Sequence, residues 1–252
     1  FKAKDLSVCT VHNDDIIKLC TSSGTQGSLS IVPRDEITLM NFLSSITSLF
    51  PSLLGLDRTG NHRAVILGPS ADEAGDIWFS YAMACLTLQV TAEYCEKNSF
   101  FDIDYAVETI RSAINNNEDL IIVGPPFRIL EVCQKIKSIK NWPSISMKSY
   151  IISAGGWKNR QREAIDKEAY RAKVAASFAT PQPSQIRDCY NMVELNSVLL
   201  ECEHHKKHIP PWLEVQARDP SSNSVLPDGK NGILAFFDAS SVSYPCFILS
   251  ED

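Results

Sequence analysis

Residues 21–28 form the stretch whose composition points most directly to chemistry. Two glycines, Gly24 and Gly27, alternate there with hydroxyl side chains, namely Thr21, Ser22, Ser23, Thr25 and Ser28. Glycine permits backbone turns that leave several N–H groups facing one ligand, and hydroxyls add donors without charge. This composition favours a polyphosphate ligand. No lysine follows Gly27, so the loop is not a Walker loop, and an ordinary surface turn is the alternative interpretation.

Two other stretches carry groups that could act on phosphates. Gly155 and Gly156 would let a flat ring approach the backbone, and Lys158 could reach a phosphate or a carboxylate. Glu194, in the run 190–194, could hold Mg²⁺, which proteins often bind through one or two carboxylates plus substrate phosphates. The alternatives are a tight strand-to-helix turn for the first stretch and an ordinary surface glutamate for the second.

The histidines and cysteines give weaker signals. His204 and His208 would share a face, and could then ligate zinc, only on a helix, whereas the prolines and β-like runs around them argue against a helix. The eight cysteines contain no CxxC pair and have mostly apolar neighbours. We therefore expect reduced, buried thiols in a cytoplasmic protein, with no thiol marked as a nucleophile.

Bulk composition limits the possible classes of protein. The 252 residues are 44% apolar and 21% charged, which is typical of a globular domain, and the net charge is −6. This charge argues against a nucleic-acid or anionic-membrane partner. No apolar run approaches the roughly 20 residues of a membrane span, and no signal peptide is visible. The chain begins at Phe1 and stops after an apolar run, so we expect both ends to be truncated.

Helical and strand periodicities alternate along most of the chain. The glycine-containing loop lies between β-like runs at 16–20 and 28–32, and an amphipathic helix at 35–50 follows, which Pro51 should end. The next expected strands are 63–67, 120–123 and 150–153, and the expected helices are 74–88, 102–115, 127–139 and 159–178. This alternation predicts an α/β fold with a mainly parallel, doubly wound sheet.

Beyond residue 181 the pattern becomes β-rich, with expected strands at 186–190, 198–202, 212–217, 232–237 and 244–249. We therefore expect an α/β nucleotide-binding part at 1–180 and a β-rich subdomain at 181–252 of the same large domain. Glycines close three predicted strands, at Gly68, Gly124 and Gly155. Ligands of open parallel sheets bind beyond the carboxyl ends of strands, so one crevice is predicted there, with the loop at its edge.

Taken in order, these pieces resemble the adenylate-forming enzyme superfamily. Residues 21–28 are similar to its phosphate loop, [ST]SGTxG, and Gly155-Gly156 to its adenine-side glycine turn. Residues 190–194 resemble its YGxTE motif, which implies that Tyr190 lies against adenine and that Glu194 lies near Mg²⁺. Asp252 resembles the aspartate that binds the ribose hydroxyls.

A closer resemblance covers essentially residues 1–252. The runs TSSGTQGSLSIVPRD, VGPPF, GGWK, SQIRDCYNMVELN, KHIPPW and FFDASSVSYPCFILSED look like the bacterial acyl-protein synthetase family (long-chain-fatty-acid–luciferin-component ligase, LuxE-type). The resemblance implies an adenylate-forming large domain without its C-terminal lid. It also implies that ATP and Mg²⁺ convert a fatty acid to acyl-AMP. The acyl group then moves to a cysteine beyond residue 252 and on to an acyl-reductase, with an acyltransferase as a further partner.

The resemblance also assigns site residues. It implies catalytic roles for Thr21, Lys158 and Glu194, with Glu194 holding the metal ion. The implied nucleotide-binding residues are Ser22, Ser23, Gly24, Thr25, Gly27, Gly155, Gly156, Tyr190, Asn191 and Asp252. One departure is that Leu29-Ser30 replaces the lysine that often follows the superfamily's loop. The alternatives are an adenylating ligase for another acid, with CoA or a carrier protein as acceptor, and a non-catalytic scaffold for an acyl-reductase.

Overall fold

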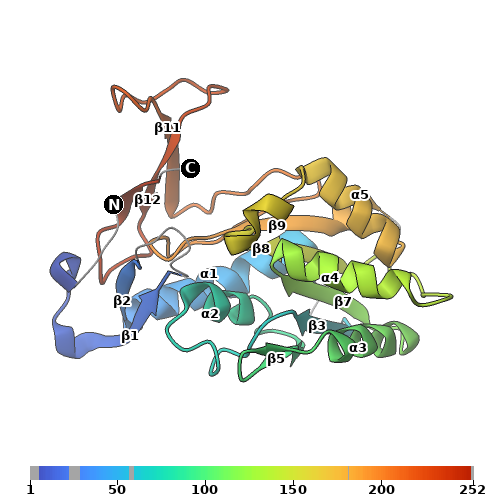
Figure 1. The fold of residues 1–252 in the computed structure, drawn as a ribbon. Coiled ribbons are helices and arrows are strands. Elements are labelled where there is room, and N and C mark those ends of the chain that lie inside the picture. The colour runs from blue at the N-terminus through green and yellow to red at the C-terminus, as the bar shows by residue number, and fades with distance from the viewer. Residues whose placement is uncertain (1–5, 23–28, 57–59, 181, 251–252) are drawn as a thin grey trace.

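The computed structural model describes residues 6–22, 29–56, 60–180 and 182–250, and gives only the backbone of residues 158 and 159. Its main sheet has six strands in the order β10-β9-β8-β7-β3-β4 (Figure 1). They are β3 (His62–Ile66), β4 (Thr91–Tyr94), β7 (Asp119–Gly124), β8 (Tyr150–Ala154), β9 (Ile186–Tyr190) and β10 (Leu199–Leu200). All neighbours are parallel except β9 and β10. The strand order runs outward in both directions from β3, so the predicted doubly wound sheet is confirmed.

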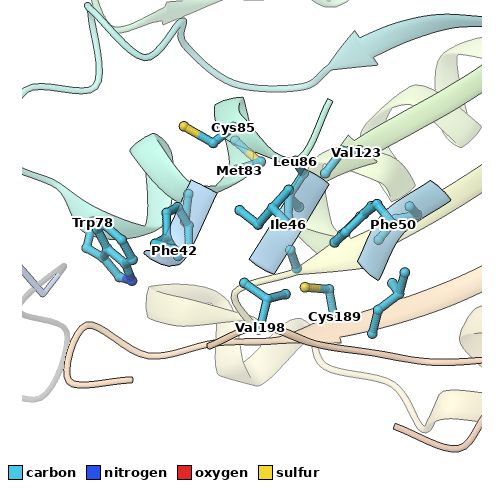
Figure 2. Packing of buried hydrophobic residues seen from close by; sticks show 14 of the residues in the cluster. Phe42, Ile46, Phe50, Trp78, Met83, Cys85, Leu86, Val123, Cys189 and Val198 are labelled. Atoms are coloured by element: carbon cyan, nitrogen blue, oxygen red, sulfur yellow. The ribbon is translucent and has the colours of Figure 1, made fainter. Parts of the chain in front are cut away.

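Helices cover both faces of this sheet. The core cluster that contains α1 (Glu36–Leu54) and α2 (Trp78–Cys85) includes Ala64 and Ile66 of β3. The cluster on the opposite face contains Val65, together with α3 (Ile103–Asn115), α4 (Pro126–Lys137) and α5 (Lys167–Phe178). Alternate side chains of one strand thus enter two cores, as the period of two requires. Figure 2 shows the first core, where aromatic and aliphatic side chains of α1 pack against α2 and the sheet.

The helix α1 extends past Pro51, so the predicted end at that proline is wrong. Asp35 caps its start by accepting a hydrogen bond from the Thr38 N–H at 2.9 Å. Pro51 has no N–H to donate to the Thr47 carbonyl, and this carbonyl accepts instead from Gln89 Nε2 at 2.9 Å. That bond compensates for the N–H that the proline lacks. The helix continues to Leu54, and Gly55, whose φ is 61°, is its C-cap.

Among the described residues, α1 is also the one helix long and apolar enough to cross a membrane by length and composition. The sequence analysis did not anticipate this, because polar serines and threonines interrupt its apolar residues. In the structure Phe42, Ile46 and Phe50 are buried in the first core (Figure 2). One apolar face of α1 is therefore packed within the domain, while Ile37 and Met40 are exposed.

Two other predicted helices are shorter than expected. The predicted helix 159–178 divides into a 3₁₀ segment, η3 (Lys158–Glu163), and α5, which Asp166 caps by accepting from the Glu168 and Ala169 N–H groups. The predicted helix 74–88 is reduced to α2. The Asp76 carbonyl is engaged by the Thr21 N–H at 2.6 Å, which holds the chain extended before the helix starts.

The remaining strands lie outside the main sheet. β1 (Ile16–Thr21) pairs antiparallel with β2 (Ile31–Asp35), and β11 (Leu213–Arg218), β12 (Ile233–Asp238) and β13 (Phe247–Leu249) form a separate antiparallel sheet. Figure 1 shows this small sheet projecting from one end of the main sheet. The five predicted strands after residue 181 all contain strands, but β9 and β10 join the main sheet. The short elements are β5 (Glu96–Lys97), β6 (Phe100–Phe101), η1 (Leu6–Val8), η2 (Asn13–Asp15) and η4 (Pro183–Gln185).

Candidate functional site

A cavity of about 700 Å³ opens beyond the carboxyl ends of β8 and β9, beside α5. This is the edge of the sheet where the sequence predicted a crevice. Four of the predicted site residues line the cavity together, although 33 residues lie between the two pairs: Gly155, Gly156, Tyr190 and Asn191. The volume lies within the usual range for small-molecule and cofactor sites.

The glycine turn forms one wall of this cavity. Gly155 has a φ of +77° and Gly156 a φ of +60°, so both adopt the left-handed backbone that favours glycine. A Cβ atom added at Gly155 would lie 2.0 Å from Cε2 of Phe79, whereas one added at Gly156 would meet nothing within 4 Å. Gly155 is therefore required by packing, while Gly156 presents open backbone that a flat ligand could approach.

The turn after β9 forms the facing part of the site. The Tyr190 ring is stacked on Phe236 of the small sheet, with centroids 6.0 Å apart and ring planes 19° apart. Asn191 accepts a hydrogen bond from Trp78 Nε1 at 2.7 Å, and its Nδ2 donates to the carbonyls of Leu195 and Ser197 at 2.9 Å. The amide of Asn191 is thus occupied in holding the turn, so this side chain shapes the cavity rather than offering a free donor.

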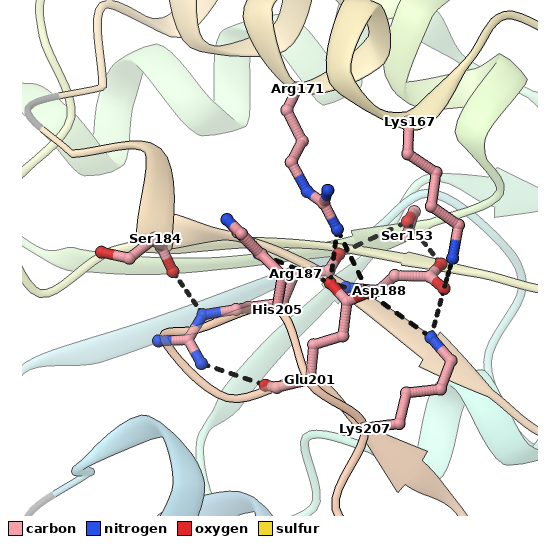
Figure 3. A network of polar contacts seen from close by, with 9 residues as sticks. All are labelled: Ser153, Lys167, Arg171, Ser184, Arg187, Asp188, Glu201, His205 and Lys207. Atoms are coloured by element: carbon pink, nitrogen blue, oxygen red, sulfur yellow. Dashed lines mark hydrogen bonds and ion pairs between the residues drawn. The ribbon is translucent and has the colours of Figure 1, made fainter. Parts of the chain in front are cut away.

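The sequence analysis missed Asp188, which lines the same cavity. Asp188 lies two residues before Tyr190 on β9, so both side chains are on the same face of the strand. That alternation is the signal that could have revealed it. Ser153 Oγ donates to Asp188 Oδ1 at 2.8 Å, and the Lys207 and Lys167 ammonium groups approach Oδ2 at 2.5 and 3.8 Å (Figure 3). A fixed carboxylate therefore faces the cavity and can accept hydrogen bonds.

Glu201 forms hydrogen bonds that hold Asp188 in place. It is buried, and its Oε2 accepts both from the Asp188 N–H at 2.9 Å and from Arg171 Nη2 at 3.0 Å (Figure 3). Lys207 Nζ lies 3.6 Å from its other oxygen. Two carboxylates and two cations thus compensate one another around the buried Glu201, while Asp188, Arg171 and Lys207 are partly exposed. The arrangement fixes the end of β9 and the orientation of the Asp188 side chain.

Two described residues lie at the start of the predicted phosphate loop. Thr21 Oγ1 donates to the Asp76 carbonyl at 3.2 Å, and Ser22 Oγ accepts from the Ser30 N–H at 3.0 Å. The Ser22 hydroxyl therefore joins the two ends of the loop, whereas the Thr21 hydroxyl joins β1 to the segment before α2. Other predicted positions lie outside the described residues: Ser23, Gly24, Thr25, Gly27, Asp252 and the side chain of Lys158.

Glu194 does not line the 700 Å³ cavity. It is 8% exposed and borders a much smaller hollow, of about 10 Å³, together with Val32 and Tyr244. Within the described ranges, no group of three or more His, Cys, Asp or Glu side chains is placed to hold a metal ion. The proposed contact between Glu194 and Mg²⁺ therefore remains a prediction.

Most of the cysteines are buried, as predicted. The buried five are Cys20, Cys85, Cys95, Cys133 and Cys189. Burial raises the pKa of Cys85 and Cys133 to about 11 and that of Cys95 to about 12, so these thiols stay protonated and are poor nucleophiles. The prediction is wrong for Cys246, which is exposed, and only partly right for Cys9 and Cys202, which are half-buried.

Comparisons with known proteins agree with the fold and with the sequence motifs. The family model "Acyl-protein synthetase, LuxE" matches residues 1–252. The long-chain-fatty-acid–luciferin-component ligases of Aliivibrio fischeri and Vibrio harveyi are 33% and 32% identical over the whole of this chain, which spans 66% of the length of each. A solved 2-hydroxyisobutyryl-CoA ligase, in complex with 2-HIB-AMP and CoA, has a TM-score of 0.69 at 12% identity, covering 97% of this chain and 53% of its own. That likeness confirms the predicted α/β fold of adenylate-forming enzymes, and the family match shows that this chain belongs to the LuxE acyl-protein synthetase family.

Proposed function

We propose that this chain is the nucleotide-binding part of an AMP-forming ligase that activates a long-chain fatty acid. The observation that carries the proposal is the 700 Å³ cavity at the ends of β8 and β9, where the glycine turn, Tyr190 and Asp188 meet. The relatives from Aliivibrio fischeri and Vibrio harveyi are named for a long-chain fatty acid, and the similar solved ligase is in complex with 2-HIB-AMP. ATP as the nucleotide and cytoplasmic localisation belong to the same proposal.

The cavity can accept the adenosine part of ATP. The open backbone at Gly156 and the ring of Tyr190 offer surfaces for a flat base, and the Asp188 carboxylate can accept from an exocyclic amine. The site can therefore hold adenine.

The first chemical step joins two anions. A fatty-acid carboxylate oxygen attacks the α-phosphorus of ATP, the bond to the bridging oxygen breaks, and pyrophosphate leaves. The carboxylate is already ionised near neutral pH, so no general base is needed. We propose that Lys158, the loop N–H groups of 23–28 and Thr21, once its hydroxyl leaves the Asp76 carbonyl, spread the developing negative charge. Mg²⁺, when bound through Glu194, would supply further neutralisation.

An apolar cavity lies directly next to the proposed nucleotide site. It measures about 20 Å³, shares Gly155 with the larger cavity, and is closed by Phe79, Met83 and Leu86 of the α2 region. We propose that an acyl chain enters on this side after these side chains move. The acyl carbon would then be attacked by a thiolate with AMP as the leaving group.

The acceptor and the partners complete the proposal. A cysteine outside residues 1–252 would take the acyl group, since five thiols here are buried and the more exposed Cys9, Cys202 and Cys246 do not line the cavity. An acyl-reductase would consume the thioester, and an acyltransferase would supply the fatty acid. A ligase with CoA or a carrier protein as acceptor shares the first step and differs only in the thiol.

ATP–pyrophosphate exchange tests the first step directly. A panel of acids from acetate to myristate, with benzoate, would be assayed with this chain and with a longer chain that extends beyond residue 252. We expect exchange to depend on the long-chain acids and to fall at least 100-fold in Glu194→Ala, because removing one group that stabilises transition-state charge costs about that much. Absence of exchange in both chains, with retained binding of an acyl-reductase, would favour the scaffold alternative.

A further inference from the structure

The helix α2 contacts both turns that form the proposed nucleotide cavity. Its second residue, Phe79, lies against Gly155, because a Cβ atom added at Gly155 would be 2.0 Å from Phe79 Cε2. Its first residue, Trp78, donates from Nε1 to Asn191 Oδ1 at 2.7 Å. Gly155 and Asn191 line both the 700 Å³ cavity and the small apolar cavity beside it. Adjacent residues of one helix thus contact the two turns where the cavities meet.

The amide of Asn191 can be oriented in only one way. An indole N–H can only donate, so the atom that Trp78 Nε1 meets is the amide oxygen. The other end of the amide, Nδ2, donates to the carbonyls of Leu195 and Ser197 at 2.9 Å. The bond from Trp78 therefore attaches the whole turn 191–197 to α2, and not only one side chain.

The indole that donates this bond is itself held firmly. Trp78 is 1% exposed, Cζ of Arg34 lies 3.4 Å from the centroid of its ring, and the centroid of the Phe42 ring lies 4.4 Å from it. Arg34 Nη2 also donates to the Val193 carbonyl at 2.7 Å, within the same turn. A ring that is packed this closely cannot shift without moving its neighbours, so it gives the turn a fixed point of attachment.

We propose that Trp78 is a positioning residue that keeps the nucleotide turn aligned with the acyl side of the site. Phe79 and Met83 of α2 border the cavity proposed for the acyl chain, whereas Trp78 lines neither cavity and holds Asn191. The acid carboxylate must meet the α-phosphorus in line, and a misplacement of about 1 Å can cost about 100-fold in rate. The inference rests on the proposed function and adds the residue through which one helix sets the relative position of both substrates.

The substitution Trp78→Phe keeps an aromatic ring next to Arg34 and removes the indole N–H. ATP–pyrophosphate exchange would be measured below the melting temperature of each protein, with the acid of the panel that supports the fastest exchange. We expect kcat to fall about tenfold or more and the KM for ATP to change less than about threefold, because alignment is lost rather than a direct contact with ATP. A merely structural role would lower the melting temperature and leave the kcat of the folded protein unchanged.

Trp142→Phe is the matched control. Its indole Nε1 has no hydrogen-bond partner among the residues that the structure describes, and Trp142 lines neither cavity. The same substitution should therefore leave kcat and KM as they are in the wild type. A fall in kcat equal to that of Trp78→Phe would overturn the inference.

Asn191→Ala breaks the same bond from the partly exposed turn, so it tests the inference even if Trp78→Phe does not fold. Its kcat should fall at least as far, and adding Trp78→Phe should lower kcat no further, because both changes act through one contact. Wild-type kcat in Asn191→Ala, or in folded Trp78→Phe, would overturn this inference alone. Absence of exchange by the wild type, in this chain and in the longer one, would overturn the proposed function, and this inference with it.

Discussion

At the scale of single residues, the site depends on a few positions whose backbone or burial leaves little choice of side chain. Gly155 and Gly156 are adjacent and both have positive φ, yet only Gly155 lies against another side chain. Sequence alone marks both as glycines of a turn. The contact with Phe79 shows that Gly155 is required because a side chain there would clash. Gly156 is required only for its backbone conformation and for ligand access.

Gly155→Ala should therefore be far more damaging than Gly156→Ala. Each substitution carries the cost of a left-handed alanine, about 1–2 kcal/mol, and the first also forces Phe79 away from a Cβ that would lie 2.0 Å from its ring. We expect Gly155→Ala to lower the free energy of unfolding by about 3 kcal/mol in total. Urea denaturation would measure both. Equal losses in the two variants would contradict the role of Phe79, and Gly155→Ala combined with Phe79→Ala should recover part of the stability.

His205 should make the protein sensitive to acid. It lies near Arg171, Arg187 and Glu201, and burial, followed by the Arg171 charge, lowers its pKa below 6.5. The unfolded chain therefore binds the proton first, and stability falls as the pH drops through 6.5 until the folded-state pKa is reached. His205→Asn removes this titration and suits the φ of 56° at that position. Stability measured between pH 5 and 7.5 should then vary less, whereas His204→Asn, at an exposed site, should keep the wild-type slope.

At the scale of elements, periodicity located most of the strands and helices but not all of their ends. The strands β7 and β8 were predictable because short apolar runs ended in glycine or small residues. The continuation of α1 through Pro51 was not, because the Thr47 carbonyl is satisfied by Gln89 from a distant segment. The start of α5 could have been predicted from Asp166, because aspartate is a good N-cap. The boundary was missed because charged residues lie on both sides of it.

The two aspartate caps on one face of the sheet offer a matched test of how α5 holds the cavity. Asp166 caps α5, which carries Lys167, Tyr170 and Arg171, while Asp102 caps α3, which does not reach the cavity. Replacing either with alanine should lower the free energy of unfolding by about 1 kcal/mol. Only Asp166→Ala should also weaken Mg–ATP binding, because it frays the turn that positions the cavity wall. Equal ATP affinity in both variants would show that the α5 cap does not support the site.

At the scale of the whole molecule, a buried polar junction connects the small sheet to the rest of the domain. Asn196 Nδ2 donates to the Thr38 carbonyl of α1 at 2.9 Å and to the Ser240 carbonyl at 3.2 Å, while its Oδ1 accepts from Arg34 Nε. Arg34 is fully buried, with its guanidinium 3.4 Å from the centroid of the Trp78 ring. Sequence could not reveal this junction, since it joins residues about 160 positions apart through side chains that look like ordinary polar residues.

This junction predicts that the α/β part and the β-rich part unfold as one unit. Asn196→Ala removes the acceptor of Arg34 Nε and one donor to each of two carbonyls, while Arg34 keeps the Val193 carbonyl and the Ser240 carbonyl keeps Asn41, so we expect a loss of about 1–3 kcal/mol in the free energy of unfolding. Circular dichroism reports mainly the helices, and hydrogen exchange at the paired amides of β11 and β12 reports the small sheet. The two signals should change together in the wild type and separate in Asn196→Ala. Asn115→Ala, at an exposed end of α3, should leave them coincident. Separate transitions in the wild type would instead indicate two independently stable domains, divided near residue 181.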